Sequence, residues 1–134
     1  MHLKIYTDGA SRSNPGKAAI GILILDENDK EIYKNGEFIG IKTNNVAEYT
    51  ALITALKKAK SLTDSEITCY SDSELMIRQL NEIYKVKQPH LKELYEQIIE
   101  LKKHFKTVHF KHVRRTNEFI QICDNLANDA LDKN

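Results

Sequence analysis

Three strand-like segments fill the first 41 residues, and the connections between them are too short to contain a crossover helix. Residues 3–8 alternate in polarity, residues 18–25 form an apolar, isoleucine-rich run, and residues 31–41 follow a polar turn. Strands joined in this way pair antiparallel. Asn35 and Gly36 are typical of a tight turn, but a bulge or bend in one continuous strand agrees better with three adjacent strands.

The remainder of the chain alternates between helical and strand-like segments. Apolar residues recur at helical spacing in four stretches, and two short apolar runs separate them: helices over 45–62, 71–84, 89–105 and 117–131, strands over 67–70 and 108–113. Strands that alternate with helices pair parallel. We therefore expect an α/β fold with a mixed five-stranded sheet, in which the last two strands run parallel to the first and helices cover both faces. No repeat or linker divides residues 1–134, so one domain is expected.

Composition narrows the choice of partner and compartment. A formal net charge of +1 gives no overall attraction to polyanions, so a nucleic acid would have to be held by a local basic patch. No apolar run has membrane-spanning length, and no signal peptide is evident. Cys69 and Cys123 lie in apolar patterns without metal-ligand spacing, which is typical of core residues in a reducing compartment. We expect a cytoplasmic monomer.

Four carboxylates occupy positions at which a working site can form. Asp8 ends the first strand, Asp72 ends the fourth, Glu48 lies in the first turn of the first long helix, and Asp124 lies in the last helix. Parallel α/β sheets place their sites at the carboxyl ends of strands, so Asp8 and Asp72 meet if their strands are neighbours. Each acid also has a simpler explanation, as a turn residue, a helix-dipole partner, a cap or a surface residue.

Convergence of these carboxylates on one crevice has a chemical consequence. Carboxylates at close range repel one another, so protons or cations are needed for them to coexist. Divalent ions such as Mg²⁺ prefer oxygen ligands and leave room for phosphate oxygens. Two such ions about 4 Å apart form a device that cleaves phosphodiesters. This hypothesis requires the fold to bring the carboxylates together, which their spacing along the chain does not decide.

Several motifs in order make the chain resemble type 1 ribonuclease H over nearly its whole length. They are "YTDGASRSNPG" at 6–16, "TNNVAEYTALITAL" at 43–56, "CYSDSELMIRQL" at 69–80, and "HV" at 112–113 with "CDNLAN" at 123–128. The resemblance implies a metal-dependent endonuclease that hydrolyses the RNA strand of RNA–DNA hybrids and leaves 3′-hydroxyl and 5′-phosphate ends. It also implies that two Mg²⁺ ions, which Mn²⁺ can replace, are bound by Asp8, Glu48, Asp72 and Asp124.

The same resemblance implies a set of polar contacts with the hybrid. It places Asn14, Asn44 and Asn45 against sugars and phosphates of the minor groove, Thr43 against a phosphate of the DNA strand, and Gly9 and Ser11 at the substrate. Amide side chains both donate and accept hydrogen bonds, as recognition of a 2′-hydroxyl requires. The asparagines are equally suited to helix capping and turn formation.

The segment before Asp124 departs from the family pattern. His112 resembles the family's histidine that assists proton transfer or product release. In the stretch "HVRRTNEFIQICD" an isoleucine, Ile120, occupies the position at which the family has an asparagine, and the loop is longer by about two residues. His112 is therefore either a catalytic residue or only a strand residue.

A second departure concerns substrate binding. Some members carry a basic, tryptophan-containing handle after the second helix, whereas this chain has no tryptophan and a short connection there. Binding would then depend on basic residues around the first helix and loop, and we expect it to be weak and salt-sensitive: Arg12, Lys17, Lys42, Lys57, Lys58 and Lys60. The alternative function is a module that binds hybrid or duplex RNA with little or no cleavage.

Overall fold

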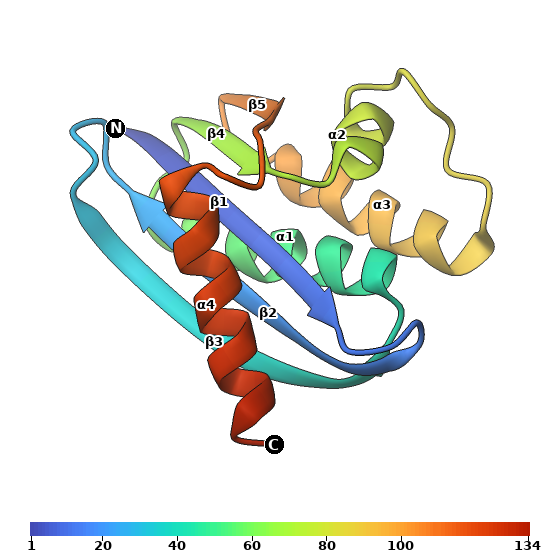
Figure 1. Cartoon of the computed structure of the whole chain (residues 1–134). Helices are drawn as coiled ribbons and strands as arrows, with labels where there is room; N and C mark the ends of the chain where they lie inside the picture. Colours follow the sequence, from blue (N-terminus) through green and yellow to red (C-terminus); the bar gives the residue numbers. More distant parts are fainter.

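The computed structural model describes all residues 1–134 and contains one mixed five-stranded sheet in the order β3-β2-β1-β4-β5 (Figure 1). β1 pairs antiparallel with β2, which pairs antiparallel with β3, while β4 and β5 run parallel to β1. The expected fold class is confirmed. The strands are β1 His2–Ser11, β2 Gly16–Leu25, β3 Glu31–Lys42, β4 Glu66–Ser71 and β5 Thr107–His112.

Helices cover the two faces of the sheet unequally. α1 (Asn44–Lys60) lies against β1 and β2 and contacts α3 (Pro89–Lys102), so these two helices form a layer on one face. α4 (Glu118–Asp132) crosses β1, β2 and β3 on the other face, in front of the sheet in Figure 1. The short α2 (Glu74–Leu80) contacts β5 and α1. No helix is both long enough and apolar enough to cross a bilayer.

Apolar side chains form a large core on one face of the sheet and smaller clusters on the other face, beneath α4. The main core lies between the sheet and α1 and α3, where the apolar stripe that the sequence predicts for α1 is buried. A smaller cluster lies beneath α4 and includes Tyr6, Leu23 and Ile120. Cys69 and Cys123 are free thiols buried in these two clusters, as expected.

Two glycines allow α4 to lie directly on the strands. A Cβ atom on Gly21 would lie 1.9 Å from the carbonyl oxygen of Cys123, and one on Gly36 would lie 2.4 Å from that of Leu126. Gly36 and Asn35 keep regular register with β2, so the expected continuous strand is confirmed, whereas the expected bulge at these residues is wrong. The register shifts lie elsewhere, and one of them is opposite Gly40, whose φ is +86°.

Among the helices, α2 differs most from its predicted range of 71–84. α2 begins after Ser73, whose hydroxyl accepts a hydrogen bond from the Met76 amide, so Ser73 is its cap and the helix starts later than expected. The helix ends at Leu80 and not near residue 84, since the amide of Ile83 turns back to the Arg78 carbonyl. The Asn117 side chain sets the start of α4, because its oxygen accepts two amide hydrogen bonds.

Candidate active site

Asp8 and Asp72 lie where the parallel pairing of β1 and β4 ends. Cα pairing between these strands stops at Tyr6 and Tyr70, whereas β1 continues for five further residues beside β2. Asp8 therefore lies within β1 rather than at its end. Asp72 follows the last residue of β4 directly. Adjacency of β1 and β4 in the sheet thus brings these two acids together from distant parts of the sequence.

Gly9 allows the beginning of α1 to lie against β1. A Cβ atom on Gly9 would lie 2.4 Å from the carbonyl carbon of Ala47 and 2.5 Å from the amide nitrogen of Glu48. The Gly9 amide donates a 2.8 Å hydrogen bond to Oε1 of Glu48. Glu48 is the fifth residue of α1, so it lies in the second helical turn and not in the first. The close backbone contact fixes its carboxylate beside Asp8.

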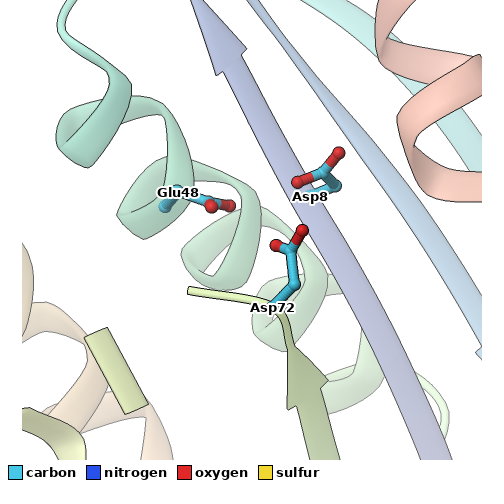
Figure 2. Close-up of side chains that lie close together, drawn as sticks. All are labelled: Asp8, Glu48 and Asp72. Carbon is cyan, nitrogen blue, oxygen red and sulfur yellow. The ribbon is translucent and has the colours of Figure 1, made fainter. Parts of the chain in front are cut away.

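Three carboxylates form a compact cluster, in which the side chains point toward one another from β1, α1 and the end of β4 (Figure 2). One oxygen from each of Asp8, Glu48 and Asp72 lies within 4.8 Å of the others. Asp8 and Glu48 are each only 6% exposed. Buried carboxylates lose the stabilisation of water, and at such short range they also repel one another. They therefore need protons or a cation between them.

Burial and mutual repulsion shift the protonation of the cluster. The pKa of Asp8 rises to about 8, first because the group is buried and then because Asp72 and Asp124 are negative. The pKa of Glu48 also lies well above its usual range, for the same reason of burial and then through the charges of Asp8 and Asp72. Arg115 opposes both shifts. A divalent cation would replace the protons that these groups otherwise hold.

An open cavity of about 530 Å³ lies over the cluster and brings six of the predicted site residues together. They are Asp8, Gly9, Asn44, Glu48, Asp72 and Asp124. Asp124 belongs to the exposed side of α4 and lies outside the compact cluster. All four predicted acids therefore face one cavity, three from buried or half-buried positions and one from its open side.

The predicted substrate-binding residues connect the β1–β2 loop to the start of α1. The backbone N–H of Asn44 donates to the side-chain Oδ1 of Asn14 at 2.9 Å. The side-chain Oδ1 of Asn44 accepts from the backbone N–H of Ser11 at 3.3 Å. Thr43 caps α1 by accepting a hydrogen bond from the Val46 amide. Asn45 is exposed in the first turn of α1. Capping and loop closure are present, and contact with a hybrid stays a prediction.

His112 does not join this arrangement. It is the last residue of β5, is exposed, and pairs through its backbone with Ser71. It is absent from the residues that line the cavity. The catalytic role implied for it by the resemblance stays a prediction.

Sequence reasoning missed Arg115, which lines the cavity from the β5–α4 connection. Its Nε atom lies 3.8 Å from Oδ2 of Asp72, and its side chain is 91% exposed. The adjacent pair Arg114 and Arg115, between the predicted histidine and the last acid, is the signal that could have found it. The other missed residues around the cavity are three neutral polar ones and two apolar ones: Ser73, Gln121, Asn125, Ala10 and Ile120.

Several of the basic residues expected to bind substrate are engaged elsewhere. Arg12 forms an ion pair with Asp132 of α4, and Lys17 donates to the carbonyl of Asn134. Lys58 lies over the Tyr33 ring at 4.7 Å in the last turn of α1, at the far end of that helix from Glu48. None of the six basic residues expected to bind substrate lines the cavity, and Arg115 is the one cation in its lining.

Comparison with known proteins gives the chain a family. A family model described as reverse transcriptase-like matches residues 6–130. Ribonuclease H of Clostridium botulinum is 36% identical, over 96% of this chain and 95% of that protein. A bifunctional protein of Mycobacterium tuberculosis is 37% identical over 98% of this chain, but the chain spans only 36% of that relative's length. Ribonuclease HI of Halobacterium salinarum is 40% identical, over 95% of this chain and 63% of that protein.

Solved structures agree with the sequence relatives. The crystal structure of ribonuclease H1 from Halobacterium salinarum superimposes with a TM-score of 0.94, at 36% identity and complete coverage of both chains. The crystal structure of LC11-RNase H1 in complex with an RNA/DNA hybrid gives a TM-score of 0.91, at 40% identity over 98% of this chain and 97% of that one. The chain belongs to the type 1 ribonuclease H family, in the short form without a basic handle.

Proposed function

We propose that this chain is a metal-dependent endonuclease that hydrolyses the RNA strand of RNA–DNA hybrids and leaves 3′-hydroxyl and 5′-phosphate ends. The observation that carries the proposal is the compact cluster of Asp8, Glu48 and Asp72 at the base of an open cavity. A protein that only binds nucleic acid has no need to gather buried carboxylates, because they repel both one another and phosphate. Family membership supports the same reaction.

The donor set suits Mg²⁺. Carboxylate oxygens are the ligands that this ion prefers, and the raised pKa values of Asp8 and Glu48 indicate a site that favours added positive charge. We assign two ions to Asp8, Glu48, Asp72 and Asp124, with Mn²⁺ as an alternative. When bound, such ions lower the pKa of a water molecule and stabilise the departing oxygen.

The chain's own groups give this site its geometry. The Gly9 amide holds one oxygen of Glu48 and so orients that carboxylate toward Asp8. Arg115, beside Asp72 on the open side, is placed to pair with a phosphate of the incoming strand. Asp124 completes the set from α4, which is held on the sheet by close contact with Gly21 and Gly36.

Recognition of the hybrid is assigned to the asparagine-rich start of α1 and the loop beside it. We assign Asn14, Asn44 and Asn45 to sugars and phosphates of the minor groove, where an amide can both donate to and accept from a 2′-hydroxyl. Thr43 is assigned to a phosphate of the DNA strand, and Gly9 and Ser11 complete the contact surface. Because few free cations surround the cavity, we expect binding to be weak. The part of it that comes from phosphate contacts falls as the salt concentration rises.

Incubation of an end-labelled RNA–DNA hybrid with Mg²⁺ or Mn²⁺ tests the proposal. We expect cleavage of the RNA strand alone, with loss in Asp72→Asn and full activity in Asp64→Asn, an exposed acid of the α1–β4 connection. Binding of the hybrid without cleavage by the parent chain would favour the alternative, a binding module of the same fold. Cleavage of single-stranded RNA or DNA instead would contradict the assignment to hybrids.

Compartment and oligomeric state stay predictions. The two buried free thiols support a reducing compartment, and we propose the cytoplasm. A monomer is proposed as well, and the elution volume of the purified chain tests it.

A further inference from the structure

A second groove, of about 360 Å³, lies between the connection after α2 and the first half of α3. That volume is within the range of sites that hold one small ligand. Tyr84 and Lys85 come from the connection, and Lys92 and Tyr95 come from α3. Val86 and Tyr95 also pack against the main core, so the base of the groove is anchored to it. We name this feature the α2–α3 groove.

Tyr84 is held in place although its ring is half exposed. The amides of Ile83 and Tyr84 both donate to the carbonyl of Arg78, at 2.8 and 3.3 Å, so the connection folds back on the end of α2. The Arg78 guanidinium lies 5.5 Å from the centre of the Tyr84 ring and is itself fixed by an ion pair with Glu74. Tyr84 as a residue is 49% exposed. A supported and exposed aromatic ring is a surface on which a flat group can stack.

The charges around the ring favour an anion. Lys85 and Lys92 line the groove and form no ion pair, and Lys87 lies two residues beyond Lys85. Glu82 is the single carboxylate in the lining. An aromatic platform with two free ammonium groups matches a nucleotide, which carries a flat base and a phosphate.

The groove is close enough to the acidic cavity to serve the same substrate. Ser73 lines that cavity and caps α2, and the connection that forms the groove follows the other end of α2. α2 has seven residues, so about 10 Å of helix separates its two ends. A strand that leaves the cavity along α2 reaches the groove within a few nucleotides.

We propose that the α2–α3 groove binds an unpaired nucleotide in the single strand that flanks a hybrid, with its base on Tyr84 and its phosphate between Lys85 and Lys92. The proposal rests on the proposed function, since the cavity must hold the hybrid. The base has to be unpaired because both faces of a base inside a duplex are covered by its neighbours. Substrates with single-stranded flanks are therefore bound more tightly than blunt hybrids.

Fluorescence anisotropy without divalent ions tests the groove. A blunt hybrid is compared with the same hybrid carrying a short single-stranded extension of either polarity, that is, at a 5′ or at a 3′ end. For at least one polarity we expect the extension to tighten binding about fivefold or more, as stacking of one base on an aromatic ring provides. Tyr84→Leu abolishes this gain and leaves cleavage of the blunt hybrid unchanged. Tyr33→Leu is the matched control, because Tyr33 also lies beside a cation, Lys58, yet is remote from the groove.

Charge variants separate stacking from phosphate binding. Lys92→Gln reduces the gain from the extension and its dependence on salt, whereas Lys103→Gln, near the other end of α3 and paired with Glu100, changes neither. Equal affinities for blunt and extended hybrids, or an equal loss of the gain in Tyr33→Leu, would overturn the proposal. Saturable binding of free adenosine monophosphate with no gain from any extension would assign the groove to a free nucleotide and also overturn it.

The outcomes for the two sites are distinguishable. Failure to bind or cleave the blunt hybrid counts against the proposed function and leaves the groove testable, since binding of single-stranded DNA by the parent chain and by Tyr84→Leu can still be compared. Normal cleavage with no preference for extended hybrids counts against the groove alone.

Discussion

The two sides of the acidic cavity are built in different ways. On one side, Asp8 and Glu48 are buried, and a contact that only glycine permits holds α1 against β1. On the other side, Asp124 and Arg115 are exposed and belong to α4 and the connection before it. Buried groups in close-packed surroundings have few alternative positions, whereas exposed side chains have many. We therefore expect the buried side to fix the geometry of the proposed reaction and the open side to adjust to the substrate.

Asp72, which is half-buried, completes the compact cluster with Asp8 and Glu48, and its removal gives the largest expected effect. Asp72→Asn keeps the shape of the side chain but removes a charge from the cluster, so we expect cleavage to fall by about a thousandfold, or ~4 kcal/mol in the barrier. Asp124→Asn, on the open side, is expected to cost about thirtyfold. Initial rates with saturating Mg²⁺ provide the measurement. Equal losses in the two variants would remove the distinction between the sides.

Glycine substitutions test whether the buried side depends on backbone contact. Gly9→Ala places a methyl group 2.4 Å from the Ala47 carbonyl carbon, which forces α1 away from β1 and displaces Glu48. We expect a loss of about a hundredfold in cleavage and ~1–3 kcal/mol in the free energy of unfolding.

Gly36→Ala is the matched control for Gly9→Ala. It forces α4 away from β3 through a similar clash at Leu126, so a comparable loss of stability is expected. Only the open side of the cavity is disturbed, and cleavage should therefore fall less than about tenfold. Urea unfolding and initial rates measure both quantities, and a larger loss of activity in Gly36→Ala would reverse the assignment.

Arg115 tests the open side alone. Arg115→Gln removes the cation beside Asp72, and we expect cleavage to fall about tenfold, mainly through weaker binding of the hybrid. Arg114→Gln removes the same charge from the neighbouring residue, which does not line the cavity, and should cost less than twofold. Measurement of KM and kcat for the two variants tests this difference. Equal changes in both variants would indicate only a general loss of positive charge.

The pH dependence of stability sharpens the account of the buried side. The pKa of Asp8 is about 8 in the folded chain, rather than its ordinary 3.8. Between these two pH values, the folded state therefore keeps a proton that the unfolded state has already lost. Stability contributed by this group is present at low pH and is lost as pH rises toward 8.

Without divalent ions, we expect the free energy of unfolding to fall by ~2 kcal/mol or more between about pH 5 and pH 8. Asp8→Asn removes much of this slope, and Mg²⁺ reduces it because the cation takes the place of the proton. Urea midpoints across this pH range give the measurement. Stability that rose with pH in the absence of metal would contradict the raised pKa.

Sequence patterns were sufficient for the fold and for the three acids of the compact cluster. Short connections between the first three strands, followed by helix–strand alternation, predicted the mixed sheet. The motifs around Asp8, Glu48 and Asp72 predicted the cluster, because these acids lie beside strand ends and a helix start that the fold brings together. Patterns gave the wrong end for α2, since the turn back to Arg78 depends on contacts beyond local periodicity.

What the sequence determined by itself was the order of the elements and the identity of the acids, because periodicity and residue type are local properties. Tertiary structure alone decided three further features: the contact of Gly9 with α1, the exposed place of Asp124 at the open side of the cavity, and the place of Arg115 at the cavity instead of His112. Each depends on how closely two backbones approach or on where a connection leads, and these distances arise only when the sheet and helices pack together.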